Sequence, residues 1–483
     1  MSADMVGLAI VILAIFLLIG KGLRSVVPVF YSFFIPSSII GGFLLLFLGP
    51  EVLGALISNE AFTYGLFNES IVAVFKTVPG LLITVIFAGL FLGKKTPKTK
   101  AVFNVSGPQL AYAQTAAWGQ YVVGILVTML FLVPVFGAQP MVGALIEIGF
   151  EGGHGTAAGL ADTFNDMGFS EGTDLALGLA TVGVVGGLII GVFLINYGVK
   201  HNHTVYLKKK TDMDSIKKTG IIPEDKRKNS MSLTVSTESI EPLAMHLGLY
   251  ALAIIVGIGF LEALKWFEQV TWARNDGIEL FAHIPLFPLA MLGGVLVQYI
   301  VNRFDRHNLF DRKMIERIQG LALDFLVVSA LAGLSLSVIA THIEVFLTLA
   351  VVGITWNLFV FLYLAKRMIP KYWFERGIGD YGQSMGMTAV GLILIRIADS
   401  KGKTPSLEAF GYMQLLFEPF IGGGLITALS VPLIYNFGPW PLFIAASVLS
   451  LGWMAVGLFY FGKLNPSTQD QLKENHKEKE GGK

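Results

Sequence analysis

The sequence predicts an all-α membrane protein built from two five-helix halves, each with a re-entrant hairpin, plus an extra C-terminal helix. Charged residues make up 14% of the 483 residues and hydrophobic residues 54%, whereas soluble proteins carry about 25% charged residues. Two uncharged stretches, Ala101–Ile146 and Pro419–Gly462, each exceed twice the roughly 20 residues that cross a bilayer. Each stretch is therefore expected to hold about two membrane-spanning helices.

Shorter uncharged runs predict further spans, and the predicted topology is ten spans before a final eleventh. Each run is long enough for one helix across the hydrocarbon core, at about 1.5 Å per residue. Helices are expected because lipid offers no partner for unpaired backbone groups. The runs are Met5–Gly20, Ser25–Pro50, Thr77–Gly93, Leu175–Val199, Leu243–Leu261, Leu280–Asn302, Phe325–Ile343 and Val345–Ala365.

Two segments carry too many glycine and polar residues for a helix that faces lipid. Residues 140–166 contain Glu147 and Glu151 beside a run of glycines, and residues 370–397 interleave glycines with polar side chains such as Asp380. Irregular backbone at membrane depth persists only where protein or water satisfies it. Both segments are therefore predicted to be re-entrant hairpins, with Glu147 and Glu151 in a water-filled vestibule.

Basic residues predict the orientation of the chain. With the N-terminus outside, all but three of the 35 Lys and Arg residues fall on one side, and the exceptions are Lys76, Lys265 and Arg274. The positive-inside rule assigns that side to the cytoplasm. Residues Lys366–Arg376 are then an inner loop, and the C-terminus lies inside the cytoplasmic (inner) membrane. The first hairpin is expected to enter from outside and the second from inside.

Ordered motif pairs indicate an internal repeat. Because the two hairpins are expected to enter from opposite sides, the halves are predicted to be inverted. Inverted halves with broken elements are the build of many secondary transporters, whose sites lie at the midplane. The paired motifs are Ile35-Pro36 with Ile284-Pro285, Gly41-Gly42 with Gly293-Gly294, and Ala88-Gly89-Leu90 with Ala332-Gly333-Leu334. The expected divisions are a first repeat (1–199, hairpin about 140–166), a basic cytoplasmic linker (200–242), a second repeat (243–436, hairpin about 370–397), an extra span (437–463) and a charged tail (464–483).

Composition and motifs exclude several classes of function. The net charge of +1 provides no basic field for nucleic acid, and zero cysteines exclude disulfides, thiolate metal sites and a cysteine nucleophile. The sequence has no H-E-x-x-H signature, so no enzyme is expected. A channel remains a rival, because matched hairpins also build channels. The basic linker is expected to be solvated, with contact to anionic lipid as the alternative.

The stretch Glu151–Gly159, reading EGGHGTAAG, followed by Ala180–Ile189, reading ATVGVVGGLI, resembles the sodium:glutamate symporter (ESS) family. GGHGT with a downstream AT-x-G-x-x-GGL is a specific combination, and weaker collinear similarity extends from Ile35 to about Tyr435. The resemblance implies sodium-coupled symport of L-glutamate, or a closely related small carboxylate, through a bilayer. It also implies a homodimer with scaffold and transport domains in an elevator motion, and no cofactor besides sodium as the coupling ion.

The second hairpin departs from the pattern of this family. Symporters of this type carry more glycine there, followed by a Thr-Pro-Thr-like element, whereas Gly382–Val390 contains no proline. The departure leaves two alternatives open, a proton-coupled carrier or a carrier selective for another organic anion or amino acid. His154 and Asp324 are ionisable residues that also favour the proton-coupled alternative.

Substrate contacts are expected at both hairpin tips. Glycines let a ligand approach free backbone N–H groups, and His154 can donate to a carboxylate or shuttle a proton. The alternatives are tight helix packing for the glycines and backbone hydrogen bonding for His154. The predicted substrate-binding residues are Gly152, Gly153, His154, Gly155, Thr156, Gly382, Gln383, Ser384 and Gly386.

Oxygen-bearing side chains near the breaks are the candidate sodium ligands. Thr156 and Thr388 each follow a glycine break, where a hydroxyl can ligate sodium or cap the following half-helix. Asp324 precedes an uncharged run, and an ionisable group inside a membrane indicates a functional site. Its alternative is a partner for Arg317 or a place at the interface. The predicted sodium ligands are Thr156, Asp324, Gln383 and Thr388.

Three other acidic residues have expected structural places. Glu418 beside Pro419 predicts a helix start, where a carboxylate complements the helix dipole, with sodium or proton coupling as the alternative. Asp162 and Asp166 are expected to face the outer aqueous end of the first hairpin.

Overall fold

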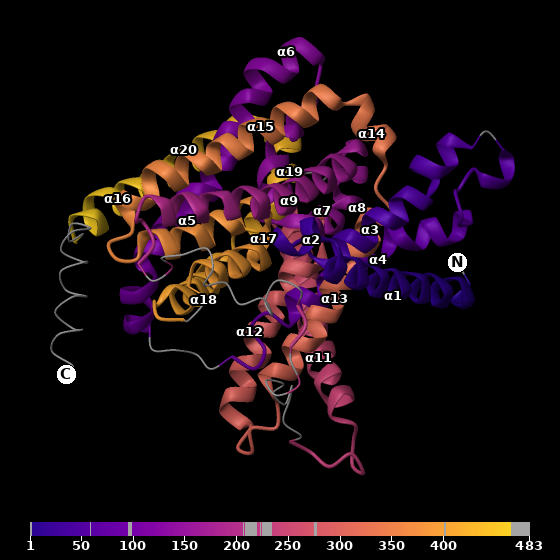
Figure 1. Cartoon of the computed structure of the whole chain (residues 1–483), viewed down its shortest axis with the longest axis horizontal. Helices are drawn as coiled ribbons and strands as arrows, with labels where there is room; N and C mark the ends of the chain where they lie inside the picture. The colour runs from indigo at the N-terminus through magenta and orange to yellow at the C-terminus, as the bar shows by residue number, and fades with distance from the viewer. Residues whose placement is uncertain are drawn as a thin grey trace.

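The computed structural model describes residues 2–57, 59–94, 99–205, 207, 220–222, 224, 234–274, 278–399 and 402–464. Within these ranges all regular structure is helical (Figure 1). Nine helices among the described residues are long and apolar enough to cross a membrane, which confirms the predicted multi-pass, all-α class. They are α1, α3 with η1, α4, α5 with η3 and α6, α9, α11, α12, α15 with η9 and α16, and α20 with η10.

The N-terminal half of the chain ends with the first hairpin, formed by η4 to α8, and the long helix α9; η denotes a 3-10 or π-helical turn. Its elements are α1 (Ala3–Val26), α2 (Pro28–Ser32), α3 (Ser37–Leu48), η1 (Pro50–Gly54), η2 (Glu60–Phe62), α4 (Glu69–Ala88), α5 (Thr99–Val127), η3 (Thr128–Leu132), α6 (Val133–Phe136), η4 (Pro140–Ala144), η5 (Glu147–Glu151), α7 (Gly153–Gly159), α8 (Ala161–Asp166) and α9 (Glu171–Lys200).

The C-terminal half contains the second hairpin within α17. Its elements are α11 (Pro242–Val270), η8 (Phe281–His283), α12 (Leu286–Phe304), α13 (Arg312–Ala332), α14 (Leu336–Thr341), α15 (Ile343–Phe359), η9 (Val360–Ala365), α16 (Lys366–Met368), α17 (Trp373–Ala398), α18 (Ser406–Phe417), α19 (Leu425–Phe437), α20 (Pro439–Ala455), η10 (Val456–Phe461) and η11 (Gly462–Leu464).

Polar caps fix where several long apolar helices begin. The Asn68 side chain accepts a hydrogen bond from the Ile71 N–H at 2.9 Å at the start of α4. Asp311 accepts from the Lys313 N–H at 2.9 Å at the start of α13. Such caps satisfy N–H groups that have no partner within the helix, so short polar residues set the boundaries of apolar helices.

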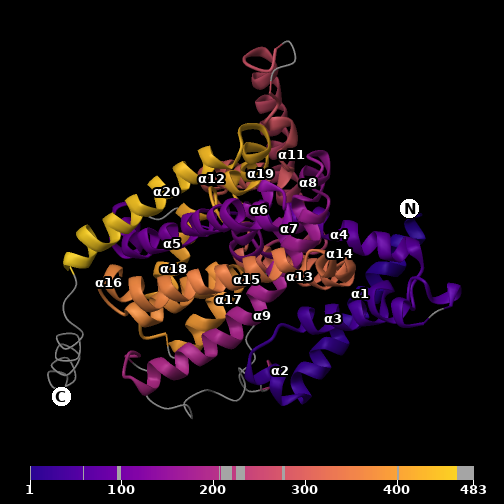
Figure 2. The ribbon, with the colours of Figure 1, turned by 90° about the horizontal axis from the view of Figure 1, so that it is seen from above.

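The helices pack as two bundles. The flanking bundle contains α1, α3, α4, α11, α12 and α13, and the core bundle contains α5, both hairpins, α9, α15, α18, α19 and α20. Figures 1 and 2 show α5 and α20 side by side, with α1 at the opposite side of the molecule. The bundles meet mainly where α7 of the first hairpin packs on α4 and α13.

Paired glycine motifs occupy matching positions in the two halves of the flanking bundle. A side chain on Gly41 of α3 would collide with the backbone of α1, and one on Gly293 of α12 with the backbone of α11. The next glycines face the other half, because Gly42 packs on α13 and Gly294 on α4. Small residues allow such close approach of helices, so the same motif serves the same packing twice.

The second motif pair ends two helices in the same way. Gly89 follows α4 and Gly333 follows α13, and both N–H groups bond to carbonyls in the preceding turn. The prediction that the uncharged run Phe325–Ile343 forms one helix is therefore wrong, because α13 ends at Ala332 and α14 follows. The first turns of α13 are highly charged, so this helix falls outside the nine apolar spans.

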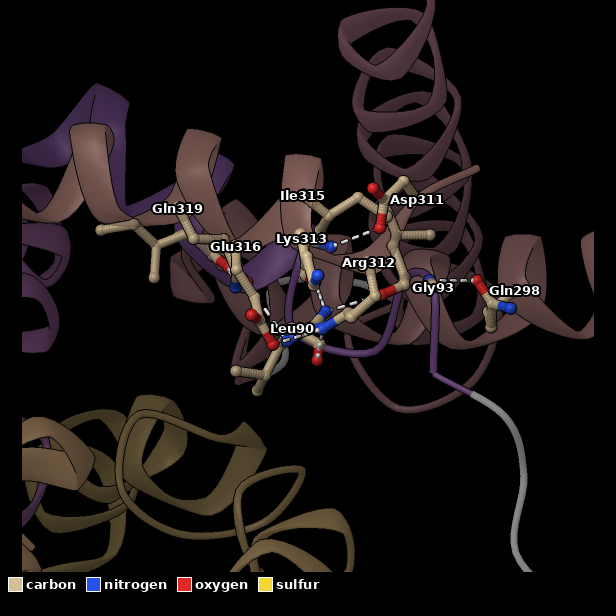
Figure 3. Close-up of polar contacts among 12 residues, drawn as sticks. Leu90, Gly93, Gln298, Asp311, Arg312, Lys313, Ile315, Glu316 and Gln319 are labelled. Carbon is tan, nitrogen blue, oxygen red and sulfur yellow. Dashed lines mark hydrogen bonds and ion pairs between the residues drawn. The ribbon is translucent and has the colours of Figure 1, made fainter. Parts of the chain in front are cut away.

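The side chain of Arg312 ties the start of α13 to the end of α4 (Figure 3). One guanidinium nitrogen donates to the carbonyls of Gly89, Leu90 and Leu92 at 3.0, 3.4 and 2.6 Å. Glu316 pairs with the Nε of Arg312 at 3.0 Å. Carbonyls at a helix end lack partners within the helix, and a cation there also complements the helix dipole.

Candidate functional site

The tips of the two hairpins touch each other. The first hairpin breaks at Gly152–Gly153, where Gly153 has φ of 71°. Helix α17 breaks at Gly386 and Met387, and its arms run back along each other because a Cβ on Gly382 would lie 2.8 Å from the Cα of Gly391. A Cβ on Gly153 would lie 3.2 Å from the sulfur of Met387. The two breaks therefore lie against each other.

Met387 holds an unusual backbone conformation at this contact. Its φ of 63° and ψ of 168° lie in a region that is essentially restricted to glycine and costs about 1–3 kcal/mol for other residues. The sequence contains no signal for this strain. Strained residues cluster at binding sites, which supports a functional role for the tip.

Glycines of α9 form the surface on which the second tip rests. A Cβ on Gly183 would overlap the carbonyl oxygen of Met385, and a Cβ on Gly386 would lie 2.6 Å from the Cα of Val184. The glycine-rich run that carries the family resemblance thus has a packing role, because it lets the tip approach the α9 backbone.

A third break completes the site and was not predicted. Helix α18 ends before Glu418, and α19 begins at Leu425. The expectation that Glu418 begins a helix is therefore wrong. Gly422 and Gly423 between the two helices have φ of 73° and 98°. The run of three glycines after Pro419 was the available signal, because positive φ values favour glycine.

Glu147 joins three elements of the core bundle. Its carboxylate accepts hydrogen bonds from the Tyr121 hydroxyl at 2.5 Å, the Gly422 N–H at 2.9 Å and the Thr427 hydroxyl at 2.8 Å. The side chain is fully buried, so the predicted water-filled vestibule is wrong for this residue. A carboxylate with three donors can stay charged inside protein.

Glu151 is also buried, with 3% of its surface exposed, and this too contradicts the predicted vestibule. Neither carboxylate oxygen has a hydrogen-bond partner among the described residues. Its polar neighbours are Ser384 and Gln383 on the second hairpin, with Glu147 and Asp380 also within electrostatic range. A buried carboxylate without partners is costly, so this position requires a functional explanation.

His154 presents an unpaired ring nitrogen. Its Nε2 lies 3.0 Å from the Thr181 hydroxyl, which donates its own proton to the Leu177 carbonyl at 2.9 Å. Thr181 can then only accept from His154, so we infer that Nε2 carries the proton. Nδ1 is buried without a partner in the described chain and is left as an acceptor.

Thr156 and Gly155 lie one turn beyond the first tip. The Thr156 hydroxyl donates to the Gly152 carbonyl at 2.9 Å, and a Cβ on Gly423 would lie 2.6 Å from the same hydroxyl oxygen. Gly155 packs against Ile83 of α4. The lone pairs of the Thr156 oxygen therefore face the glycine break between α18 and α19.

Polar side chains from neighbouring helices hold the second tip. The backbone carbonyl of Ser384 accepts from Gln120 at 2.7 Å and from Asn357 at 2.8 Å. The amide of Gln383 pairs with that of Gln414 on α18. The Thr388 hydroxyl donates to Glu418 at 2.8 Å. The structure thus gathers every predicted site residue except Asp324 around the meeting tips.

Asp324 lies apart from the tips. It is on α13 in the flanking bundle, with an exposed side chain whose polar neighbour is Ser38 of α3.

A buried charged pair lies in the first arm of the second hairpin. The Nε of Arg376 donates to Gln109 of α5 at 3.2 Å, and Gln109 donates to Asp380 at 2.9 Å. Arg376 also interacts directly with Asp380 through its charge. Arg376 is only 6% exposed, so the expectation that it belongs to an inner loop is wrong.

A cavity of about 750 Å³ lies between the bundles beside the first hairpin. Asp162, Asp166, Asp174, Lys76 and His283 are among the residues that line it. His283 Nδ1 lies 3.4 Å from Asp166. The acidic excess of these side chains favours cations over anions in the cavity.

The comparisons with known proteins agree with this architecture. The family model for sodium/glutamate symporters matches residues 4–373. The chain belongs to the sodium/glutamate symporter family. This family match includes the first hairpin and ends at the start of α17, so the second hairpin lies outside it.

Two curated members of the sodium/glutamate symporter family show the degree of similarity. A sodium/glutamate symporter of Haemophilus influenzae is 25% identical over 428 residues, covering 86% of this chain and 93% of the relative. A sodium/glutamate symporter of Escherichia coli is 23% identical over 366 residues, covering 72% and 83%. The predicted family is therefore confirmed. No group of three or more His, Cys, Asp or Glu residues fit for a metal ion occurs in the part of the chain that the structure describes.

Proposed function

We propose that this protein is a sodium-coupled symporter of L-glutamate or a closely related small carboxylate. The observation that carries the proposal is the meeting of two broken segments and a third glycine break around buried, unpaired polar atoms. Transporter sites are typically formed by discontinuous helices near the bilayer midplane. Membership of the sodium/glutamate symporter family supports the choice of substrate and ion.

The substrate is proposed to lie between the tips, against Gly152–Thr156 and Gly382–Gly386. Glycines at both breaks leave backbone groups accessible to a carboxylate. The unpaired Nδ1 of His154 is an acceptor suited to the ammonium group of an amino acid. Ser384 and Gln383 contribute polar atoms from the second tip and are proposed to select the substrate.

Sodium is proposed to bind oxygens of Thr156, Gln383 and Thr388 next to the substrate. Hard cations prefer hydroxyl, carbonyl and carboxylate oxygens. Asp324 is exposed on α13 beside Ser38, and we assign it to the scaffold. Coupling requires that sodium and substrate together favour the crossing state more than sodium does by itself.

The transport motion is proposed to carry the core bundle past the flanking bundle, as in an elevator. The matched contacts of the paired glycines support two inverted repeats, and both tips belong to the core bundle. A homodimer joined through the flanking bundle is proposed from the family resemblance. The proposed setting is the inner membrane, with the N-terminus outside and the C-terminus inside.

A proton-coupled or differently selective carrier is the second candidate. It is favoured by the second hairpin, which lies outside the family match and carries Gln383 and Ser384 at its tip. A channel is a weaker candidate, and it would show flux without counter-flow exchange.

The test is uptake of labelled L-glutamate into proteoliposomes. Separate vesicles receive an inward sodium gradient, a potassium gradient or a pH gradient. The proposal expects accumulation only with sodium, at constant pH. Accumulation driven by the pH gradient without sodium would replace it with the proton-coupled candidate. Sodium-dependent thermal stabilisation without glutamate uptake would mean that the protein binds sodium but that glutamate is the wrong substrate.

A further inference from the structure

Glu151 is a buried carboxyl group that the substrate site does not explain. It precedes the first tip directly, and both of its oxygens lack a hydrogen-bond partner among the described residues. Glu147, one helical turn earlier, is equally buried but has three donors. The difference is local, because the two side chains share one helical segment and one bundle.

The surroundings of Glu151 hold an excess of negative over positive charge. Asp380 on the second hairpin is within electrostatic range of Glu151 and is compensated by Arg376. From α5, the facing titratable group is the neutral phenol Tyr112. The loop between α18 and α19 presents Gly422. If these two carboxylates and the neighbouring Glu147 are ionised, Arg376 offsets one of the three charges, and bound cations would offset the others.

The neighbouring atoms are of the type that a hard cation requires. The Ser384 hydroxyl and the Gln383 amide lie beside the Glu151 carboxylate, and Oδ2 of Asp380 also lacks a hydrogen-bond partner in the described chain. Sodium is bound by oxygen ligands of this kind, and an anionic ligand raises affinity. The structure thus places a carboxyl group and neutral side-chain oxygens together in the buried interior of the protein.

We propose that Glu151, with Ser384 and Gln383, forms a sodium site that fills before the substrate binds. The site shares Gln383 with the sodium ligands proposed above, and it differs from the hydroxyl oxygens of Thr156 and Thr388 because its charge comes from a carboxylate. It bridges the two hairpins, so occupation fixes the second tip against the first and prepares the surface for the substrate. This inference deepens the proposed sodium coupling and rests on it for the identity of the ion.

The test measures sodium binding to the purified full-length protein without glutamate. Thermal unfolding is followed by tryptophan fluorescence while NaCl replaces choline chloride at constant ionic strength and constant pH. The sodium midpoint is the NaCl concentration that gives half of the maximal rise in Tm. We expect Glu151→Gln to raise this midpoint at least tenfold. The matched control is Glu147→Gln, which removes the same charge one turn away and is expected to stay within threefold.

Three outcomes would overturn the proposal. The first is a sodium midpoint in Glu151→Gln equal to that of the wild type. The second is stabilisation of the wild type by lower pH but not by sodium, which would mean that a proton holds the site. If Glu151→Gln does not fold, Ser384→Ala serves instead, with an expected threefold to tenfold rise in the sodium midpoint. The third outcome is a sodium midpoint in Ser384→Ala equal to that of the wild type.

Labelled glutamate binding to the same preparations separates this inference from the proposed function. Wild-type protein that binds sodium but no glutamate would refute the substrate and leave the Glu151 site standing. Wild-type protein that binds glutamate in a sodium-dependent manner, together with an unaffected Glu151→Gln, would refute only the site.

Discussion

The contact between α9 and the second tip predicts a large difference between two neighbouring glycines. A Cβ on Gly183 would overlap the Met385 carbonyl oxygen, whereas a Cβ on Gly186 would meet only the end of the Met385 side chain at 3.9 Å. Real Cβ atoms essentially never approach another heavy atom within 3.0 Å, so the tip must retreat by about 1 Å in Gly183→Ala. Overpacking of this kind costs about 1–3 kcal/mol.

The intrinsic effect of the substitution is the same at both positions. Replacing glycine by alanine inside a helix favours the helix by about 1 kcal/mol. For Gly183→Ala this gain offsets part of the overpacking, so the net loss of stability is about 0–2 kcal/mol. Gly186→Ala has no comparable cost and is expected to be slightly more stable than the wild type.

Transport should separate the two variants more strongly than stability does. Displacing a binding group by about 1 Å can cost on the order of 100-fold in the efficiency of a site. We therefore expect Gly183→Ala to lose at least tenfold in the ratio of maximal uptake rate to KM in proteoliposomes, and Gly186→Ala to stay within twofold. Thermal unfolding checks that both proteins are folded. Equal uptake by the two variants would refute the reasoning that α9 positions the tip.

Three further predictions concern contacts outside the substrate site. Arg312→Lys keeps the charge but has one nitrogen in place of the three that bind the carbonyls after α4, Glu316 and Gln319, so we expect a loss of about 1–3 kcal/mol in chemical denaturation; an unchanged midpoint would show that one ammonium group replaces these contacts. Tyr121→Phe removes one of three donors from buried Glu147 and should cost about 1.5–3 kcal/mol, measured against Tyr435→Phe, an exposed tyrosine. Burial, with the positive charges of Lys366 and His201, lowers the pKa of His203 below its usual 6.5. Because the unfolded chain binds that proton more readily, stability is lost as pH falls below about 6.5, and His203→Gln should flatten this part of the pH profile of Tm; a profile identical to the wild type would contradict this.

Several features of this protein follow from short-range physics and could be read from residue order. Uncharged runs such as Ala101–Ile146 must form helices because lipid cannot satisfy backbone groups. One candidate span, Ser106–Phe136, appears among the described residues of this run, and not the two that were predicted. The motif pair at Gly89 and Gly333 ends two helices identically, because a helix end depends on the few residues around it. Gly153 adopts a positive φ at a break that its glycine-rich surroundings predict.

Long-range packing decided the rest of the site. Glu147 and Glu151 look equivalent in the sequence, one turn apart, yet only Glu147 receives donors, from Tyr121, Gly422 and Thr427. Those donors come from helices far away along the chain, so no local pattern reports them. The burial of Arg376 and the strain at Met387 have the same origin. The sequence by itself determined the family, most of the helices and the glycine breaks of the two hairpins, because these depend on local composition. Tertiary structure decided which breaks meet and which carboxylate stays without a partner, because only packing brings distant donors and charges together.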